Sequence, residues 1–171
     1  MKIDKVVVGL LETNCYIISI DNECIVIDPG DEYSKIKEFI GNKKIVAVII
    51  THYHFDHIGA LDNFDKNLIL DKNNLEEKEY SIGNFTFKVI YTPGHKEDSI
   101  TIYFEKEKTI FTGDFMFKGT IGRMDLPGGN EFDMIKSLNK MKKYPKDILI
   151  YPGHGSSSML GNELDTNYIL W

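Results

Sequence analysis

Three histidines and one aspartate lie within six consecutive positions, in the sequence HYHFDH. Imidazoles this close repel one another when protonated and compete for hydrogen-bond partners when neutral. A divalent cation relieves both problems, and imidazole with carboxylate is a donor set that suits zinc, iron or manganese. In an extended segment, residues two apart point the same way with Cα atoms about 6.6 Å apart, so His52 and His54 can bind one ion. Asp56 and His57 lie where the chain is expected to turn into a helix, which favours a second ion nearby.

The chain has five histidines, and each follows a predicted strand at the point where the chain enters a loop. His95 ends the run VIYTPGH and His154 ends LIYPGH, while Asp114 ends a further strand in TIFTGD. Loops at strand ends carry functional groups because the rigid sheet positions them. A single histidine beside glycine is usually structural, but five of five at strand ends is difficult to explain in that way.

Short runs rich in β-branched and aromatic residues predict the strands that position these groups. The expected strands are residues 5–11, 15–20, 24–28, 45–51 and 68–70, two strands around Gly83-Asn84, a hairpin that turns near 105–108, and a last strand at 147–155. The tripeptide ETN at 12–14 is predicted to be a turn between the first two strands.

Apolar residues at helical spacing predict three helices. The first contains Ile36, Phe39 and Ile40 and stops at Gly41, and the second is a short helix at 56–64. The third covers Glu131–Tyr144, where apolar residues recur every three positions at Phe132, Ile135, Leu138 and Met141. Two runs of strands, each followed by helices, indicate stacked sheets with helices outside, an α+β sandwich.

The 171 residues suit one domain, 1–171, with 42% hydrophobic and 27% charged residues. The apolar runs are strand-sized and shorter than the roughly 20 residues of a membrane span. The N-terminal segment lacks the features of a secretory signal, so we expect a cytoplasmic protein.

A net charge of −6 argues against partners such as nucleic acid or an anionic membrane. Cys15 and Cys24 lie in apolar runs and are expected to be reduced, partly buried thiols. The oligomeric state is left open.

The motif HYHFDH matches the HxHxDH signature of the metallo-β-lactamase-fold superfamily, and TPGH, TGD and PGH match its later ligand motifs in the same order. The resemblance extends from NCYII to the C-terminal GNELDTNYIL. Within the superfamily, GTIGRMDLPGG (Gly119–Gly129) resembles the small glyoxalase-II-like hydrolases. This resemblance implies a four-layer αββα sandwich with a dinuclear metal site at the edge of the two sheets.

The resemblance also implies which residues bind metal. His52, His54 and His95 would hold the first ion, Asp56, His57 and His154 the second, and Asp114 would bridge them. The expected cofactors are two divalent ions, zinc first, with iron or manganese as alternatives. The residues assigned to catalysis are His52, Asp56 and His154.

The function that follows is metal-dependent hydrolysis of a small thioester or related ester. A divalent ion lowers the pKa of bound water to about 7, so hydroxide is available as the nucleophile, and two ions can also stabilise the oxyanion. The sequence contains no GxSxG motif and no cysteine with a nearby histidine. The occupied centre would carry net positive charge, so we expect a small-molecule substrate that can be anionic.

Three alternatives stay open: a persulfide dioxygenase that keeps a single iron on two histidines and one aspartate, a lactonase, and a non-catalytic metal-binding protein. The chain departs from the hydrolase family at two points. The residues after His154 are too few for the helical domain with which glyoxalase II helps bind glutathione. Lys96 follows His95 where many relatives have threonine or serine. The glutathione substrate is therefore not carried over.

Several further residues are candidates for supporting roles. Arg123 is the only arginine, and with Lys96 it is a candidate substrate-binding residue, since its planar fork can grip a carboxylate. The preferred interpretation is an internal pair between Arg123 and Asp125 or another acid. Asp28, in the run IDPGD, either orients the histidine loop by hydrogen bonds or only forms a turn. Phe115, Met116 and Phe117 could line a pocket but are more often core.

Overall fold

The computed structural model describes residues 1–167, and its strands form two large sheets. The first sheet has the order β1-β2-β3-β4-β5, with antiparallel pairing of β1, β2 and β3 and parallel pairing of β3, β4 and β5. Its strands are β1 (Lys2–Val8), β2 (Thr13–Ile20), β3 (Glu23–Ile27), β4 (Lys44–Ile49) and β5 (Ile69–Leu70).

The second sheet has the order β13-β12-β9-β8-β7-β6, in which only β12 and β9 pair in parallel. Its strands are β6 (Glu79–Ile82), β7 (Phe85–Tyr91), β8 (Ile100–Phe104), β9 (Thr109–Gly113), β12 (Leu149–Pro152) and β13 (Ser158–Met159). A separate two-stranded hairpin is formed by β10 (Met116–Phe117) and β11 (Thr120–Ile121).

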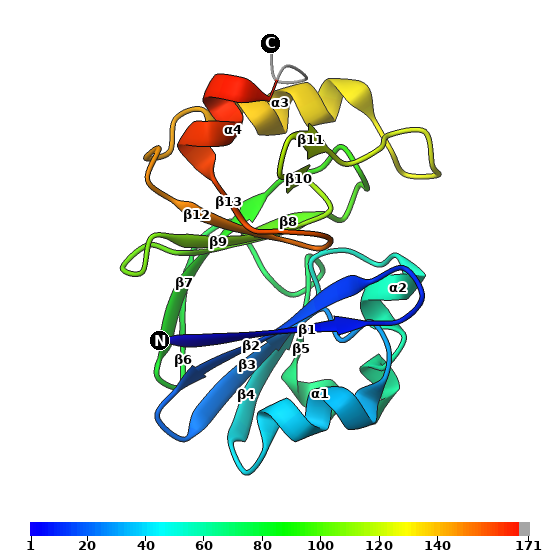
Figure 1. Ribbon diagram of the computed structural model, residues 1–171, viewed down its shortest axis with the longest axis vertical. Helices are drawn as coiled ribbons and strands as arrows, with labels where there is room; N and C mark the ends of the chain where they lie inside the picture. Colours follow the sequence, from blue (N-terminus) through cyan, green and yellow to red (C-terminus); the bar gives the residue numbers. More distant parts are fainter. Residues whose placement is uncertain (168–171) are drawn as a thin grey trace.

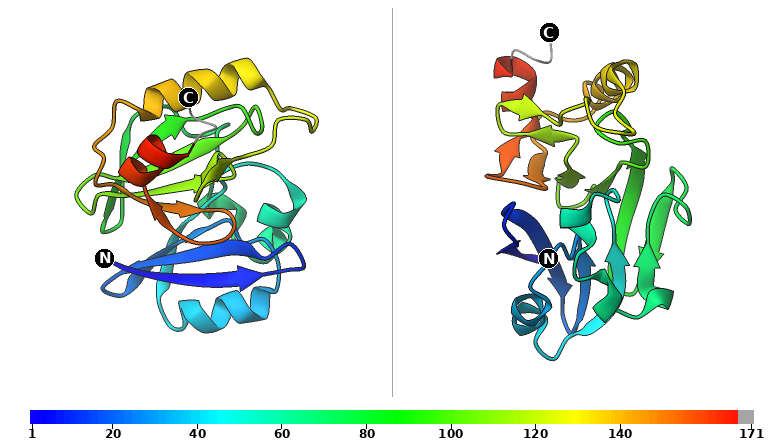
Figure 2. Two further views of the ribbon diagram at one scale, coloured as in Figure 1. Left: turned by 45° about the horizontal axis from the view of Figure 1, so that its top comes forward. Right: turned by 90° about the vertical axis from the view of Figure 1, so that its right-hand side faces the viewer.

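Helices cover the outer face of each sheet, with α3 (Glu131–Met141) and α4 (Leu160–Thr166) over the second sheet and α1 (Tyr33–Ile40) over the first (Figures 1 and 2). Smaller helical turns are α2 (Phe55–Ile58), η1 (Leu61–Asn63) and η2 (Lys66–Leu68). None of the helices within residues 1–167 has the length and the apolar composition of a membrane-spanning segment.

The apolar residues divide into three layers because side chains alternate across a strand. In β2, Tyr16 and Ile18 pack between the two sheets against Phe87, Ile102 and others. The intervening residues Cys15 and Ile17 pack toward α1 instead, and a third cluster lies between the second sheet, α3 and α4. The predicted α+β sandwich with layers αββα is therefore confirmed.

The first hairpin differs from the prediction in its register. We expected a strand at 5–11 and a turn at 12–14, whereas β1 ends at Val8 and β2 already begins at Thr13. Thr13 and Asn14 pair with Val8 and Val7. The prediction was wrong because threonine and asparagine commonly occur in turns, while here long-range contacts of their side chains keep them in the strand.

The predicted helix at 131–144 forms but ends at Met141, and it buries a different face from the one predicted. Met134, Ser137, Leu138 and Met141 are buried, while Phe132 and Ile135 are 65% and 50% exposed. A three-residue repeat drifts around a helix of 3.6 residues per turn, so Phe132 and Leu138 cannot share one face. The buried residues follow the i, i+3, i+4, i+7 spacing of a core-facing helix.

The segment after Asp114 contains the hairpin β10–β11, which was not predicted, nor were β13 and α4. Phe115 and Met116 are fully buried, as the core interpretation expected, whereas Phe117 is half-buried with its ring 6.2 Å from that of His154. The expected single domain extends to residue 171, and the resemblance at GNELDTNYIL extends to residue 170; residues 168–171 lie outside the described part.

Candidate metal centre

Seven histidine and aspartate side chains lie together at the edge where the two sheets meet. The first sheet supplies four of them, since His52 and His54 follow β4 and Asp56 and His57 belong to α2. The second sheet supplies the others, from the ends of three strands: His95 after β7, Asp114 after β9 and His154 after β12. These are the seven positions that the sequence singled out as metal ligands, and the structure brings all of them together.

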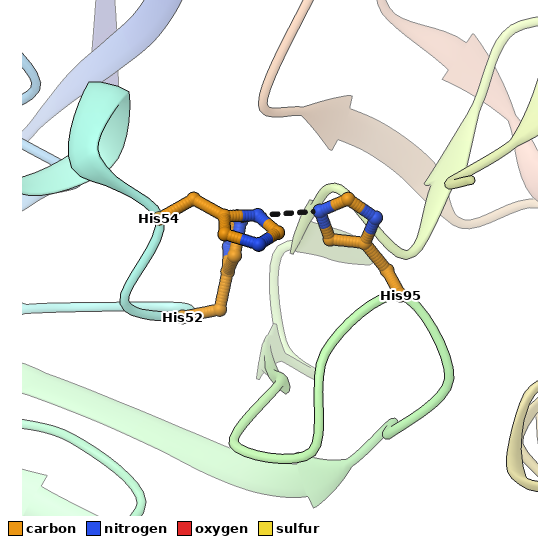
Figure 3. A group of neighbouring side chains, drawn as sticks. All are labelled: His52, His54 and His95. Carbon is orange, nitrogen blue, oxygen red and sulfur yellow. Dashed lines mark hydrogen bonds between the residues drawn. The ribbon is translucent and has the colours of Figure 1, made fainter. Parts of the chain in front are cut away.

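His52, His54 and His95 form one group of converging nitrogens (Figure 3). His54 Nδ1 lies 3.0 Å from His52 Nε2 and 2.8 Å from His95 Nε2. His95 Nδ1 must donate to the Arg123 carbonyl at 2.7 Å, because a carbonyl only accepts, so the neutral tautomer that fits this contact has its lone pair on Nε2.

The same reasoning sets the tautomer of His52. Thr51 donates its hydroxyl to Asp28 at 2.7 Å and accepts from His52 Nδ1 at 3.1 Å, which leaves a lone pair on His52 Nε2. Two lone pairs therefore face His54 Nδ1, where a single proton can satisfy only one of them. A cation bound by all three nitrogens satisfies the whole group.

A second group consists of Asp56, His57 and His154. His57 Nδ1 contacts Asp28 Oδ2 at 2.9 Å, and His154 Nδ1 donates to the Leu11 carbonyl at 3.0 Å. In each case Nε2 is left to face the site, where His154 Nε2 lies 3.2 Å from Asp56 Oδ2. Thr13 donates its hydroxyl to the same Asp56 oxygen at 2.9 Å.

Asp114 lies between the two groups. One carboxylate oxygen, Oδ1, is 3.3 Å from His57 Nε2, and the other, Oδ2, is 3.4 Å from His154 Nε2 and 3.6 Å from His95 Nε2. Within residues 1–167, Asp114 Oδ1 and His57 Nε2 are both buried and have no hydrogen-bond partner. Buried polar atoms in this state are costly, so this pair has the environment expected of metal-binding atoms.

The pKa values of His52 in the first ligand group and of His57 and His154 in the second are shifted in opposite directions. Burial, and then the charge of His57, holds the pKa of His52 well below its usual range, which favours the neutral imidazole that a metal ligand requires. Burial alone would also lower the pKa of His57, but Asp28 and Asp114 outweigh it and raise the pKa to about 10. Burial alone would lower the pKa of His154 as well. The carboxylates of Asp114 and Asp56 outweigh this effect and raise the pKa of His154 to about 9. This second group stabilises positive charge, which a divalent cation also supplies.

The pKa values of the two carboxylates, Asp56 and Asp114, are shifted downward. Burial favours a higher pKa for Asp56, yet hydrogen bonds from His154 and Thr13 and the charge of His57 lower it to about 2. The pKa of Asp114 is lowered too, since contacts with His154 and His57 outweigh its burial. Both acids are therefore ionised and suited to bind a hard or borderline cation.

Two glycines allow the ligands to approach this closely. A Cβ on Gly153 would lie 2.2 Å from Asp114 Oδ1 and 2.7 Å from His57 Cε1. A Cβ on Gly122 would lie 1.9 Å from the Asp114 carbonyl oxygen and 2.9 Å from His95 Cβ. Real Cβ atoms do not approach so closely, so only glycine fits at either position.

The proposed supporting residues have different surroundings. Asp28 is 2% exposed and accepts hydrogen bonds from the Thr51 backbone N–H, the Thr51 hydroxyl and His57 Nδ1. The interpretation in which Asp28 orients the histidine loop therefore has the contacts that it requires. Asp28 also has a φ of 50°, so it forms the turn as well.

The charged groups of Arg123 and Lys96, the two candidates for substrate binding, pair with nearby aspartates, and no hydrogen bond recorded among the described residues joins them to the seven candidate ligands. Arg123 binds both oxygens of Asp125, at 2.7 and 2.6 Å, and it is the Arg123 carbonyl that contacts His95. Lys96 forms an ion pair with Asp98 at 3.1 Å. A substrate role for Arg123 or Lys96 is thus a proposal that these pairs do not favour.

Sequence reasoning missed the contribution of the β1–β2 hairpin. Thr13 contacts Asp56, the Leu11 carbonyl contacts His154, and Asn14 binds the loop that carries His154. One signal was available in the sequence, because asparagine is uncommon inside an otherwise apolar strand and so indicates a specific hydrogen-bonding role.

Comparison with known proteins identifies close relatives in sequence. The family model of the metallo-β-lactamase superfamily matches residues 8–72 and 67–154. A Bacillus subtilis (strain 168) protein named probable metallo-hydrolase YqgX is 32% identical, over 99% of this chain and 98% of that protein. Hydroxyacylglutathione hydrolase GloC of Haemophilus influenzae is 30% identical, over 99% of this chain and 98% of that protein.

Solved structures with the same fold are found among proteins of this superfamily and its relatives. BLEG-1, a B3 metallo-β-lactamase, superposes with a TM-score of 0.91 at 29% identity, covering 99% of both chains. TTHA1623 in a di-iron-bound form has a TM-score of 0.88 at 28% identity, covering 98% of this chain and 100% of the other. ETHE1 from Myxococcus xanthus has a TM-score of 0.88 at 25% identity, covering 98% and 84%. Since the family model and relatives at 30% identity or more span nearly all of its sequence, the chain belongs to the metallo-β-lactamase superfamily, among relatives named metallo-hydrolases.

Proposed function

We propose that this protein is a hydrolase with a dinuclear metal centre that cleaves small acyl thioesters or related esters. The observation that carries the proposal is the position of Asp114, whose carboxylate oxygens lie near His57 and His154 of the second ligand group and His95 of the first. A carboxylate between two ligand groups is suited to bridge two ions. The relative named hydroxyacylglutathione hydrolase supports a thioester as the substrate class.

Each ligand group would hold one ion: His52, His54 and His95 the first, and Asp56, His57 and His154 the second, with Asp114 contributing to both. Zinc is the ion we expect, with iron or manganese as alternatives. When bound, divalent ions acidify water and polarise a carbonyl, which is the chemistry that ester hydrolysis requires. A thioester suits this chemistry because a thiolate leaves without a strong general acid.

The chain's own residues determine how a substrate reaches this centre. His52 and His57 are buried at 1% and 0% exposure and form its base. His54 and Asp56 are half-buried, and the His154 side chain is 28% exposed, so the centre is open on their side. We propose that the substrate carbonyl enters there. Asp28 keeps the His57 proton on Nδ1, and Thr13 and the Leu11 carbonyl hold Asp56 and His154 toward the opening.

The proposal includes a small and preferably anionic substrate, because two divalent ions outweigh the charges of Asp56 and Asp114. It also includes a cytoplasmic location, which the two free, buried thiols Cys15 and Cys24 suit.

A second candidate is a mononuclear iron oxidoreductase acting on a persulfide. His52, His57 and Asp114 form a group of two histidines and one carboxylate, the ligand type of many non-haem iron(II) oxygenases. The dinuclear hydrolase accounts for more of the site, because it uses all seven side chains.

The test supplies zinc-, manganese- and iron-loaded protein with a small hydroxyacyl thioester and, separately, with glutathione persulfide. Thiol release and oxygen uptake are followed in parallel. We expect metal-dependent thiol release, its loss in Asp114→Asn, and its retention in Asp125→Asn, an exposed aspartate outside the ligand groups. Oxygen uptake with iron and persulfide, without thiol release from any thioester, would establish the oxidoreductase instead.

A further inference from the structure

The loop that carries His154 is held by the opposite sheet. Three carbonyl groups of this loop, those of Pro152, Gly153 and Gly155, point toward the first sheet and accept hydrogen bonds from it. All three accept from Asn14 at the start of β2. Its backbone N–H binds the Gly153 carbonyl at 2.7 Å, and its Nδ2 binds those of Pro152 and Gly155 at 2.9 and 3.0 Å.

Asn14 is 1% exposed. Its hydrogen bonds cross from the first sheet to the second and join residues that are far apart in the sequence, since Asn14 and Pro152 are 138 positions apart. Its Oδ1 is buried and has no hydrogen-bond partner in the described part of the chain. An unpaired amide oxygen in the interior is costly, and the two hydrogen bonds donated by Nδ2 offset the cost of burying this side chain. Tyr16, two residues further along β2, adds a hydrogen bond from its hydroxyl to the Pro152 carbonyl at 2.6 Å.

The rest of the hairpin contacts the same group of ligands. Thr13 forms an isolated bridge with His154 and donates its hydroxyl to Asp56, while the Leu11 carbonyl accepts from His154 Nδ1. Two of the three residues of the second group are thus fixed by Leu11–Asn14.

The first ligand group has different supports. Thr51 and Asp28 orient His52, and the Arg123 carbonyl orients His95. No hydrogen bond recorded for residues 1–167 joins the segment Leu11–Asn14 to the first-group histidines His52, His54 and His95. The hairpin therefore acts on one half of the centre.

We infer that Asn14 is a positioning residue for the second metal position alone: by holding the loop Pro152–Gly155 against β2, it sets the place of His154 and hence the affinity for the second ion. This inference rests on the dinuclear centre proposed above. Loss of a residue that orients a metal ligand typically weakens metal binding by about 10- to 100-fold.

The experiment titrates metal-free protein with Co²⁺ and with Zn²⁺ in competition with a chelator, so that the two binding steps give separate dissociation constants. The variants are Asn14→Ala and Thr13→Val, and the matched control is Ser19→Ala, which removes a buried hydroxyl from the same strand without a recorded partner. Thermal unfolding of each metal-free variant shows that it folds. If Asn14→Ala does not fold, Tyr16→Phe, which removes one hydrogen bond from β2 to the Pro152 carbonyl of the same loop, is titrated in its place and should weaken the second step alone.

We expect the second step to weaken by about 10- to 100-fold in Asn14→Ala and Thr13→Val while the first step changes by less than about twofold, and both steps to be unchanged in Ser19→Ala. If Asn14→Ala weakens both metal-binding steps equally, Asn14 only supports the scaffold. If both steps are unchanged, it does not position His154. Either result overturns the inference. A single binding step in the unsubstituted protein would instead refute the dinuclear centre, and the inference with it.

Discussion

Replacement of Asp28 by asparagine should weaken metal binding through the proton on His57. The carboxylate accepts three hydrogen bonds, two from Thr51 and one from His57 Nδ1. An amide has only one oxygen, and the Thr51 backbone N–H is a donor that cannot be rearranged. If the Asn oxygen faces Thr51, its NH₂ faces His57 Nδ1, and the imidazole proton must move to Nε2, the atom that faces the metal position.

The magnitude follows from these contacts. A hydrogen bond to a charged group contributes about 1.5–3 kcal/mol, and a buried donor left unpaired costs about 1–3 kcal/mol. We therefore expect metal-free Asp28→Asn to be less stable by about 2 kcal/mol. The second metal position, which uses His57, should bind about 10- to 100-fold more weakly. The first position should weaken too, by less, because Asp28 reaches His52 only through Thr51.

The assay is the same two-step metal titration, together with chemical unfolding of the metal-free protein. Glu163→Gln is the matched control, because Glu163 is also 2% exposed and accepts from three donors, those of Gly119, Ser158 and Asn167, but has no recorded contact with the seven ligand candidates. It should lose comparable stability with unchanged metal affinity. If Asp28→Asn behaves like Glu163→Gln, with lower stability and native metal affinity, the orienting role is wrong.

Three further predictions concern single residues. His154→Ala should reduce the metal content from about two ions to about one by elemental analysis, and unchanged stoichiometry would contradict the assignment of His154. Gly153→Ala should lose both stability and metal, measured by unfolding and by elemental analysis, because the new methyl group would displace Asp114 and His57. Gly119→Ala, with nothing within 4 Å of its Cβ but a φ of 77°, should lose stability alone. Arg123→Lys should leave the KM for an acyl thioester unchanged, because Arg123 is engaged with Asp125, and a severalfold rise in KM would show that it binds substrate.

The seven side chains that converge at the site could be picked out from the sequence because their signals are local. Each candidate ligand follows a short apolar run within a few residues, and the nearly unbroken apolar runs of β2, β3 and β4 indicate buried strands, which pack on both faces in the structure. The hairpin between β8 and β9 was predicted on the same basis, from its strand-forming residues and the charged turn between them.

The residues that orient the ligands could not be predicted in this way. Thr13 and Asn14 were assigned to a turn on local propensity, and the partners that define their role lie 43 and 138 positions away in the sequence. The contribution of Leu11 is a backbone carbonyl, which has no sequence signal at all. The requirement for glycine at position 153 likewise arises from Asp114 and His57, which no local pattern relates to it.

The division of ligands between the sheets explains why these orienting residues matter. Four candidate ligands belong to the first sheet and three to the second, so the centre forms only if the sheets meet in one register. The apolar layer between the sheets is non-directional and tolerates small shifts. The hydrogen bonds from Asn14 and Tyr16 to the loop Pro152–Gly155 are directional, and they lie beside His154. They can therefore set the distance between Asp56 and His154 before any ion binds, which the hydrophobic layer alone cannot do.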